Sequence, residues 1–197
     1  FPQQLTVTNN FTLGRYGEIE LSVNGRLYQP TNVVLPGTAA NDLQDLNNRS
    51  RIQLDDGSNV QNPVPLPPYF NAEGTLRLGD TTDNLTAVMG YGFGVYELQP
   101  VGPVAFNTEN PRTDAPDVGG SVQVASFNVL NYFTTIDDSG PICGPLADQG
   151  CRGADTADEF TRQHDKIVDA IVKMDADVVG LIEIENHATD DALQFLV

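Results

Sequence analysis

The region most informative about the fold begins with SVQVASFNVLNYF at residues 121–133 and ends with DADVVGLIEIEN at residues 175–186. Each is an apolar run that finishes in polar residues. The segment between them, EFTRQHDKIVDAIVKM at residues 159–174, has helical spacing. Strand, helix and strand in this order predict a βαβ unit with two parallel strands. Both strands then end at the same edge of the sheet, where open α/β folds bind their ligands.

Two polar residues, Asn128 and Glu183, stand at these strand ends, and we expect them to lie close together although 55 residues separate them. Alternation along the second strand places Leu181, Glu183 and Glu185 on one face. A carboxylate that follows a buried strand is costly unless it is paired or binds a metal. A hard cation such as Mg²⁺ needs few protein ligands, so one glutamate and one asparagine amide fit half of a phosphodiester-cleaving site. The alternative is that Glu183 and Glu185 simply reach solvent, and the pattern alone does not choose.

A capping box at residues 156–159 predicts the start of the helix, and Phe160, His164, Ile167 and Ile171 recur at helical spacing along it. We interpret His164 as a boundary residue of this helix rather than a ligand. His187, four residues after Glu183, is within reach of the site edge, although loop histidines are more often simply exposed.

The first half of the chain, residues 1–107, predicts an all-β domain. Ile19, Leu21 and Val23 alternate before Asn24-Gly25, a strong hairpin signal. Further strands are expected at residues 51–54, 75–78, 85–89 and 94–98, separated by Gly and Pro clusters. Several short strands without a helical pattern favour a five-stranded OB-type barrel. Residues 108–120, rich in Pro, Gly and Asp, are expected to link it to a second domain at residues 121–197.

The charge of the chain is strongly acidic, with 27 acidic and 10 basic residues and a net charge of −17. Such a surface repels nucleic acid and anionic membranes unless cations intervene. It does not exclude a nuclease that uses metal ions. No apolar run reaches the length of a membrane span. The chain begins at Phe1 without Met and ends at Val197 in what resembles a helix start, so we expect it to be part of a longer protein.

The only cysteines, Cys143 and Cys151, lie in the loop sequence ICGPLADQGC, inside a predicted loop at residues 132–153. Long loops without structure of their own are often functional. A disulfide here would close a short loop, contribute about 2–3 kcal/mol and imply an oxidising compartment. Two unlinked thiols are the alternative, which we disfavour because exposed thiols are usually avoided.

Taken together, SFNVLNYF and DADVVGLIEIEN resemble the opening motifs of the endonuclease/exonuclease/phosphatase superfamily. The likeness is closest to the large secreted bacterial extracellular nucleases of the ExeM type. There RGAD, RQ and GLIEIEN recur in the order in which they stand here, at residues 152–155, 162–163 and 180–186. GRYGEIEL, RIQLDDGS and FGVYELQP in the first half resemble the OB-like domain that precedes the nuclease domain in those proteins.

The resemblance implies an OB-like β-barrel followed by the first βαβ portion of a truncated four-layer α/β sandwich of the DNase I-like type. Glu183 matches the glutamate that binds the catalytic metal, and Asn128 matches the asparagine that helps to hold the metal and phosphate site. Asn131 and Asn186 are implied substrate-binding residues, with Glu185 a further candidate. The implied cofactor is a divalent metal, with Mg²⁺ first and Ca²⁺ or Mn²⁺ as alternatives.

The function implied is that of a secreted, extracellular or periplasmic nuclease acting on DNA or RNA. The superfamily's G-D-x-N motif and late Asp-His pair are missing here, so we expect the 197-residue chain to be inactive by itself. One alternative keeps the fold but makes it a phosphatase or phospholipid phosphodiesterase. The other is a non-enzymatic binding module in which the β-domain is the working part.

Overall fold

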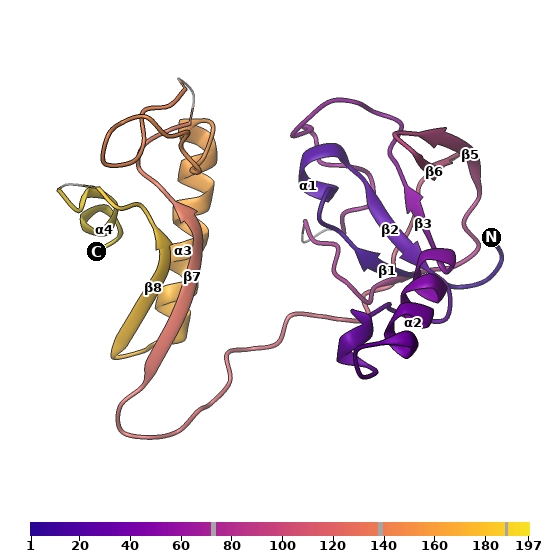
Figure 1. Cartoon of the computed structure of the whole chain (residues 1–197), viewed down its shortest axis with the longest axis horizontal. Coiled ribbons are helices and arrows are strands. Elements are labelled where there is room, and N and C mark those ends of the chain that lie inside the picture. The colour runs from indigo at the N-terminus through magenta and orange to yellow at the C-terminus, as the bar shows by residue number, and fades with distance from the viewer. Residues whose placement is uncertain (72–73, 138–139, 188) are drawn as a thin grey trace. The chain divides into compact units, whose positions relative to one another are not determined.

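The chain forms two compact units, Phe1–Arg112 and Thr113–Val197, in a computed structural model that describes residues 1–71, 74–137, 140–187 and 189–197 (Figure 1). Both units combine strands with helices, so the fold is mixed α/β. Within the described residues, no helix has both the length and the apolar character needed to cross a membrane.

The first unit is built on a six-stranded sheet in the order β4-β1-β2-β3-β6-β5. Neighbouring strands are antiparallel except β3 and β6, which are parallel. Its strands are β1 (Leu5–Asn9), β2 (Ile19–Ser22), β3 (Arg51–Leu54), β4 (Thr81–Thr82), β5 (Ala87–Gly92) and β6 (Val95–Pro100). Its helices are α1 (Leu13–Tyr16), the 3-10 turn η1 (Pro30–Asn32) and α2 (Thr38–Arg49).

Alternation along the central strands makes the core of this unit. Ile19 is paired with Leu54 and Leu21 with Ile52, and Leu54 is paired with Leu98 on β6. Paired residues share a face, so these side chains form one apolar layer, in which Ile19, Leu21, Leu54 and Leu98 are fully buried. Each such side chain contributes about 1.5–3 kcal/mol through its removal from water.

Helix α2 contradicts the expectation that residues 1–107 contain no helix. Its sequence, TAANDLQDLNNR, is rich in polar residues, and Ala40 is its one buried residue. Its apolar residues Ala40, Leu43 and Leu46 do recur at helical spacing, but they are few among polar residues and the pattern was overlooked. The OB-type barrel stays a prediction: among the described residues, no pairing joins the two edge strands, β4 and β5.

The turn at Asn24-Gly25 forms, but the predicted hairpin does not. Both residues are left-handed, with φ of 63° and 95°. After the turn the chain leads to η1 and α2, and β2 is paired with β1 and β3 instead. The prediction of a strand at residues 75–78 is also wrong. Leu76 is buried there without a strand, because Asn71 and Thr75 are held by side-chain hydrogen bonds.

A buried carboxylate holds the end of the first unit against its sheet. Asp80 is 2% exposed, and its oxygens accept hydrogen bonds from the backbone N–H groups of Arg77 (2.8 Å), Glu109 (3.1 Å) and Asn110 (3.3 Å). A buried charge is costly unless such bonds are made. Residues 109 and 110 are therefore held by the first unit.

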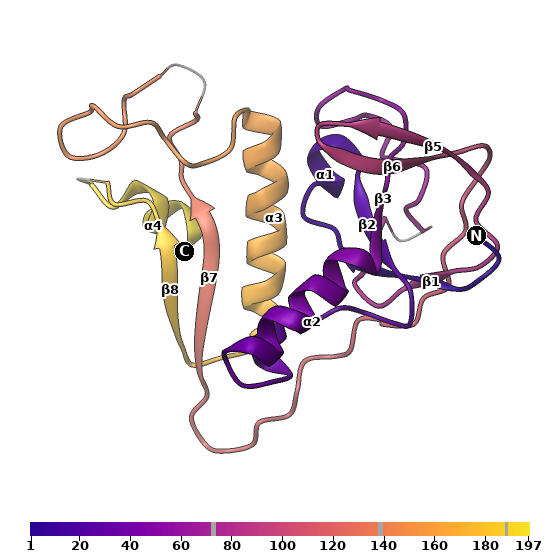
Figure 2. The same cartoon turned by 45° about the vertical axis from the view of Figure 1, so that its right-hand side comes forward.

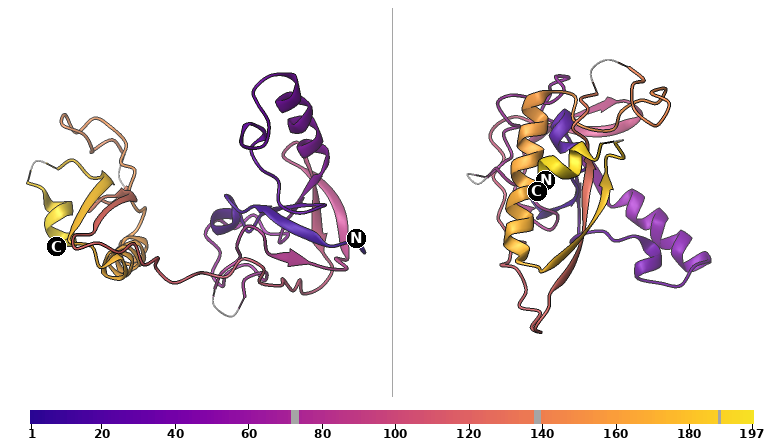
Figure 3. Two further views of the ribbon diagram at one scale, coloured as in Figure 1. Left: turned by 90° about the horizontal axis from the view of Figure 1, so that it is seen from below. Right: turned by 90° about the vertical axis from the view of Figure 1, so that its left-hand side faces the viewer.

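The second unit contains the predicted βαβ arrangement. Strands β7 (Val124–Tyr132) and β8 (Val178–Ile184) are parallel, and α3 (Ala157–Met174) is the crossover between them. A short helix, α4 (Asp191–Leu196), follows. Helix α3 runs along one side of the strand pair (Figures 2 and 3). The N-cap half of the predicted capping box is confirmed, because the Thr156 hydroxyl accepts from the Glu159 N–H at 3.2 Å. The Glu159 carboxylate accepts instead from the N–H of Asp155, one residue before the N-cap, at 3.0 Å.

One face of the β7–β8 pair is covered and the other is not. Phe127 and Leu181, which are paired, pack with Ile167 and Ile171 of α3. The opposite face carries Val124, which is 74% exposed. The remaining exposed members of that face are Ser126, Asn128, Val178, Gly180 and Ile182. The second unit therefore has a single-sided core.

Candidate functional site

Strands β7 and β8 end at the same edge of their sheet, as the βαβ pattern predicts. Asn128 is paired with Ile182, so Glu183 stands one residue beyond the partner of Asn128. The next pair is Tyr132 with Ile184, so the chain advances four residues on β7 while it advances two on β8. The strand ends are thus adjacent but irregular.

Residues at this irregularity have a left-handed backbone conformation. Leu130, Asn131 and Glu183 have φ of 52°, 54° and 64°. Non-glycine residues avoid this region, and each costs about 1–3 kcal/mol unless the surrounding structure holds it there. Such residues cluster at functional sites. This feature was missed from the sequence, where only Asn131 is of a type that tolerates the conformation.

The bend at Glu183 corrects the expected alternation of β8. Leu181 and Ile184, three residues apart, both pack in the core of the unit, so Glu183 does not share a face with Leu181. The Glu183 side chain is exposed. Within the described residues it makes no hydrogen bond or ion pair. A free carboxylate therefore stands at the end of β8.

The Asn128 amide is held in place by its own turn. Its Oδ1 accepts a hydrogen bond from the Leu130 N–H at 2.8 Å, which also supports the bend at Leu130. An amide oxygen has two acceptor positions, so one is left for a ligand. Asn128 is exposed, and the half-buried Asn131 lies in the irregular part of β7.

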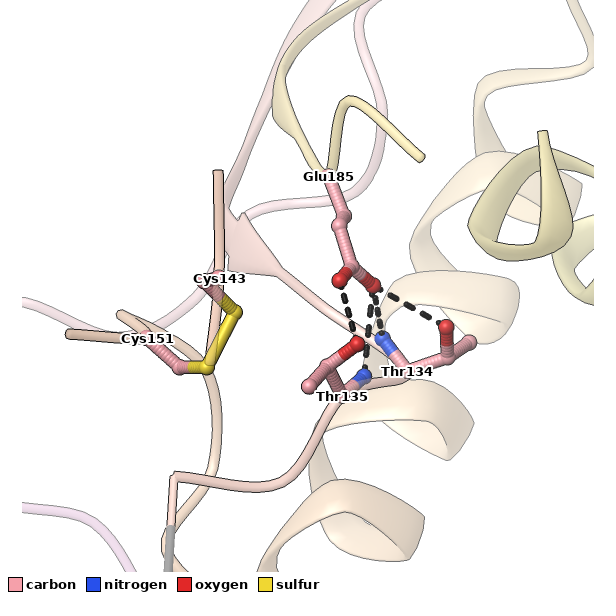
Figure 4. Close-up of a disulfide and its surroundings, with 5 residues drawn as sticks. All are labelled: Thr134, Thr135, Cys143, Cys151 and Glu185. Atoms are coloured by element: carbon pink, nitrogen blue, oxygen red, sulfur yellow. Dashed lines mark hydrogen bonds between the residues drawn. A yellow bond between two sulfur atoms is a disulfide. The ribbon is translucent and has the colours of Figure 1, made fainter. Parts of the chain in front are cut away.

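Glu185, by contrast, is already committed to the loop that follows β7 (Figure 4). Its carboxylate accepts from the N–H groups of Thr134 (2.8 Å) and Thr135 (3.2 Å) and from both threonine hydroxyls. Burial raises the pKa of Glu185, but the hydrogen bonds from Thr135 and Thr134 outweigh it and hold the pKa below its ordinary value. Glu185 is thus an ionised clamp rather than a free ligand.

A cleft of about 450 Å³ lies beside this clamp, between the disulfide loop and the end of β8. The predicted bond between Cys143 and Cys151 is present, with Cα atoms 5.1 Å apart and both cysteines buried. Asn186 lines the cleft together with the following side chains of different chemistry: Phe133, Thr135, Arg152, Glu185 and His187. Two residues of the same loop, 138 and 139, lie outside the described residues.

Among the described residues, neither histidine makes a hydrogen bond or ion pair with Asn128 or Glu183. His164 is half-buried, its Nδ1 lies 2.7 Å from the Tyr132 hydroxyl, and its ring packs near Phe160 and Phe195. Burial raises the pKa of Tyr132 to about 12, so this hydroxyl keeps its proton at neutral pH. His187 lies at the cleft, with Nδ1 2.8 Å from the Thr189 hydroxyl and 3.3 Å from Asp191.

The oxygens at the strand ends fit a divalent cation in type but supply only part of its coordination. Within the part of the chain that the structure describes, no three His, Cys, Asp or Glu side chains are grouped to hold a metal. Asn128 and Glu183 offer one amide and one carboxylate oxygen. These are ligands that Mg²⁺ accepts while keeping waters and phosphate oxygens as the rest.

Comparison with family models, with curated proteins and with solved structures finds no match to this chain.

Proposed function

We propose that this chain carries the first half of the active site of a metal-dependent phosphodiesterase that cleaves nucleic acid. The observation that supports the proposal most directly is the pairing of β7 with β8. It brings the fixed amide of Asn128 and the free carboxylate of Glu183 to one sheet edge. Left-handed residues on both strands accompany them there.

The candidate residues would have different roles in the reaction. A bound divalent cation would neutralise charge that develops on the phosphate and lower the pKa of a water molecule. Glu183 would hold that cation, and Asn128 would help to hold the cation and the phosphate. Asn131 and Asn186 would donate amide N–H groups to the substrate. The chain has no G-D-x-N or Asp-His sequence, so the 197 residues are expected to be inactive alone.

The charge of the second unit agrees with a need for cations. Residues 113–197 hold 16 acidic and 4 basic residues, a net charge of −12. A polyanion approaches such a surface only when cations screen it or bridge it. The disulfide fits an oxidising compartment, and we propose an extracellular or periplasmic location.

The first test measures the metal site in the 197-residue chain without requiring activity. Mn²⁺ added in small amounts should broaden the amide NMR signals around residues 128–131 and 183, because it is paramagnetic. Glu183→Gln should abolish this broadening. Glu109→Gln, a matched change at an exposed glutamate of the first unit, should leave it unchanged. Broadening that survives Glu183→Gln would remove Glu183 from the site.

The second test uses the protein in which this chain occurs. With Mg²⁺, Mn²⁺ or Ca²⁺ it should cleave plasmid DNA, and Glu183→Gln should reduce the rate at least about 100-fold through loss of a metal ligand. RNA, sphingomyelin and nucleotide monophosphates form the substrate panel. Hydrolysis of a phospholipid or monoester in place of DNA would favour the phosphatase or phospholipase alternative. Full activity in Glu183→Gln would contradict the proposal.

A further inference from the structure

A second surface of interest lies on the first unit, at the hairpin formed by β5 and β6. Large apolar side chains are exposed there at unusual density, with Tyr91 at 66% and Phe93 at 97% exposure. The other exposed members within residues 88–96 are Val88, Met89, Val95 and Tyr96. Soluble proteins rarely expose so concentrated an apolar patch unless it meets a partner.

The backbone of β5 is open along one side. It is the last strand of the sheet, and β6 is the one strand paired with it among the described residues. Proteins usually protect such an edge with a charged side chain, a proline or a bulge. The sequence of β5 is AVMGYG, and its register with β6 is unbroken over six pairs, so none of these protections is present.

The apolar layer of the core also continues out to this edge. Leu21 is paired with Ile52, and Tyr96 is paired with Tyr91. Gln53 of β3 is paired with Glu97 of β6 in a parallel ladder. The residues before them, Ile52 and Tyr96, are therefore also neighbours across these two strands. This row is fully buried at Leu21 and mostly exposed at Tyr91, whose ring lies 5.1 Å from that of Tyr96. A strand added beside β5 would extend the sheet and cover the exposed end of the row.

The lack of charged residues at this edge favours a second copy of the chain as its partner. Residues 84–96 read NLTAVMGYGFGVY and contain no charged residue, in a chain whose net charge is −17. Two copies of the chain repel each other over most of their surface but not here. The carboxylate of Glu97, on β6, lies over Gly90 and Gly92 of β5. If two β5 strands overlap fully over residues 87–92, residue 91 faces residue 88 of the copy. The two carboxylates are then offset by about three residues, roughly 10 Å, along the strands, which exceeds the screening length of about 8 Å at physiological ionic strength.

We propose that β5 is the interface for a second copy of this chain, with two β5 strands paired antiparallel about a two-fold axis. The opposite end of the sheet does not offer the same edge. There β4 is two residues long, and Thr81 is already bridged to Asn107. Pairing through β5 alone closes on itself, so the assembly is a dimer and not a fibre. This proposal is independent of the phosphodiesterase function.

Sedimentation velocity and light scattering of the 197-residue chain in 0.15 M salt test it directly. From about 1 to 300 μM, a span that covers weak and standard-sized interfaces, the mass should rise from 21.3 kDa to twice that value. Tyr91→Glu should weaken the dimer at least about 10-fold. Val124→Glu, at an equally exposed apolar residue on the open face of β7, is the matched control and should dimerise like the unmodified chain.

Amide hydrogen exchange gives a second measurement that does not depend on a variant. Residues 87–92 should become protected as the concentration of the unmodified chain rises, while β8 should not change. A monomer throughout the concentration range would overturn the proposal. So would a dimer that survives Tyr91→Glu but is lost in Val124→Glu, because the interface would then lie on the second unit.

Discussion

The two units differ in how much apolar surface they bury and in where their backbone is strained. Among the described residues, ten buried apolar side chains form the core of the first unit, whereas the main cluster of the second has four. Left-handed non-glycine residues of the first unit are Asn24, Asn62, Asn84 and Phe93, mostly of the type that tolerates the conformation. In the second unit Leu130 and Glu183 adopt it at strand ends.

The larger buried core and the candidate site therefore lie in different units of this molecule. A smaller core has less free energy of unfolding to offset strained residues that cost about 1–3 kcal/mol each. We therefore expect the second unit to unfold first and to respond more strongly to substitutions. Three experiments test this difference between the two units.

The largest effect is expected from truncation of the α3 core. Ile167→Ala removes a 6% exposed side chain that packs in the small cluster, which should cost about 2–5 kcal/mol. That loss is comparable with the whole stability of a small domain. Hydrogen exchange should show the second unit unfolded and the first unit intact. Val172→Ala, at an exposed position of α3, is the control and should change little. If both variants behave alike, the cluster does not hold the unit.

A smaller effect is expected from removal of the disulfide. Cys143→Ser with Cys151→Ser, or reduction of the unmodified chain, should lower the stability of the second unit by about 2–3 kcal/mol, since the bond closes a short loop. Denaturant unfolding followed by NMR should show a lower midpoint for that unit. The first unit contains no cysteine, so its midpoint should not respond to the reductant.

The smallest effect is a pH response of opposite sign in the two units. Glu185 has a lowered pKa, so its stabilisation is present above the ordinary value of 4.5 and is lost as the pH falls through the lowered value. Burial raises the pKa of Glu18 in the first unit, so its contribution is present below 4.5 and is lost as the pH rises through the raised value. Acidification should therefore weaken the second unit and spare the first.

Unfolding midpoints of each unit between pH 3 and 7 would measure this difference. Glu185→Gln should flatten the acid loss in the second unit, because the side chain no longer titrates. Glu18→Gln should flatten the opposite trend in the first unit. Parallel pH profiles in the two units would show that these carboxylates do not control the response.

The sequence predicts what depends on period and spacing. Residues 121–133, 159–174 and 175–186 are long enough for the βαβ unit to be expected, and the short spacing of Cys143 and Cys151 is sufficient for the disulfide. Helix α2 was missed because its apolar residues are few among polar ones. The left-handed conformations of Leu130 and Glu183 could not be predicted, because they arise from a change of register between two strands distant in sequence. The sequence therefore predicts which residues belong to the candidate site but not the backbone conformation that positions them.

The hydrogen bonds of Asp80 determine where the first unit can be excised for transplantation into another protein. A chain cut after residue 107 would lose the Glu109 and Asn110 N–H groups and leave a buried carboxylate short of donors. It would also lose the Asn110 carbonyl that accepts from Arg77 at 2.7 Å and the Asn110 amide that donates to Leu78 at 2.8 Å. A cut after Arg112 keeps all of these bonds. Asn110 thus closes the first unit as a self-contained module.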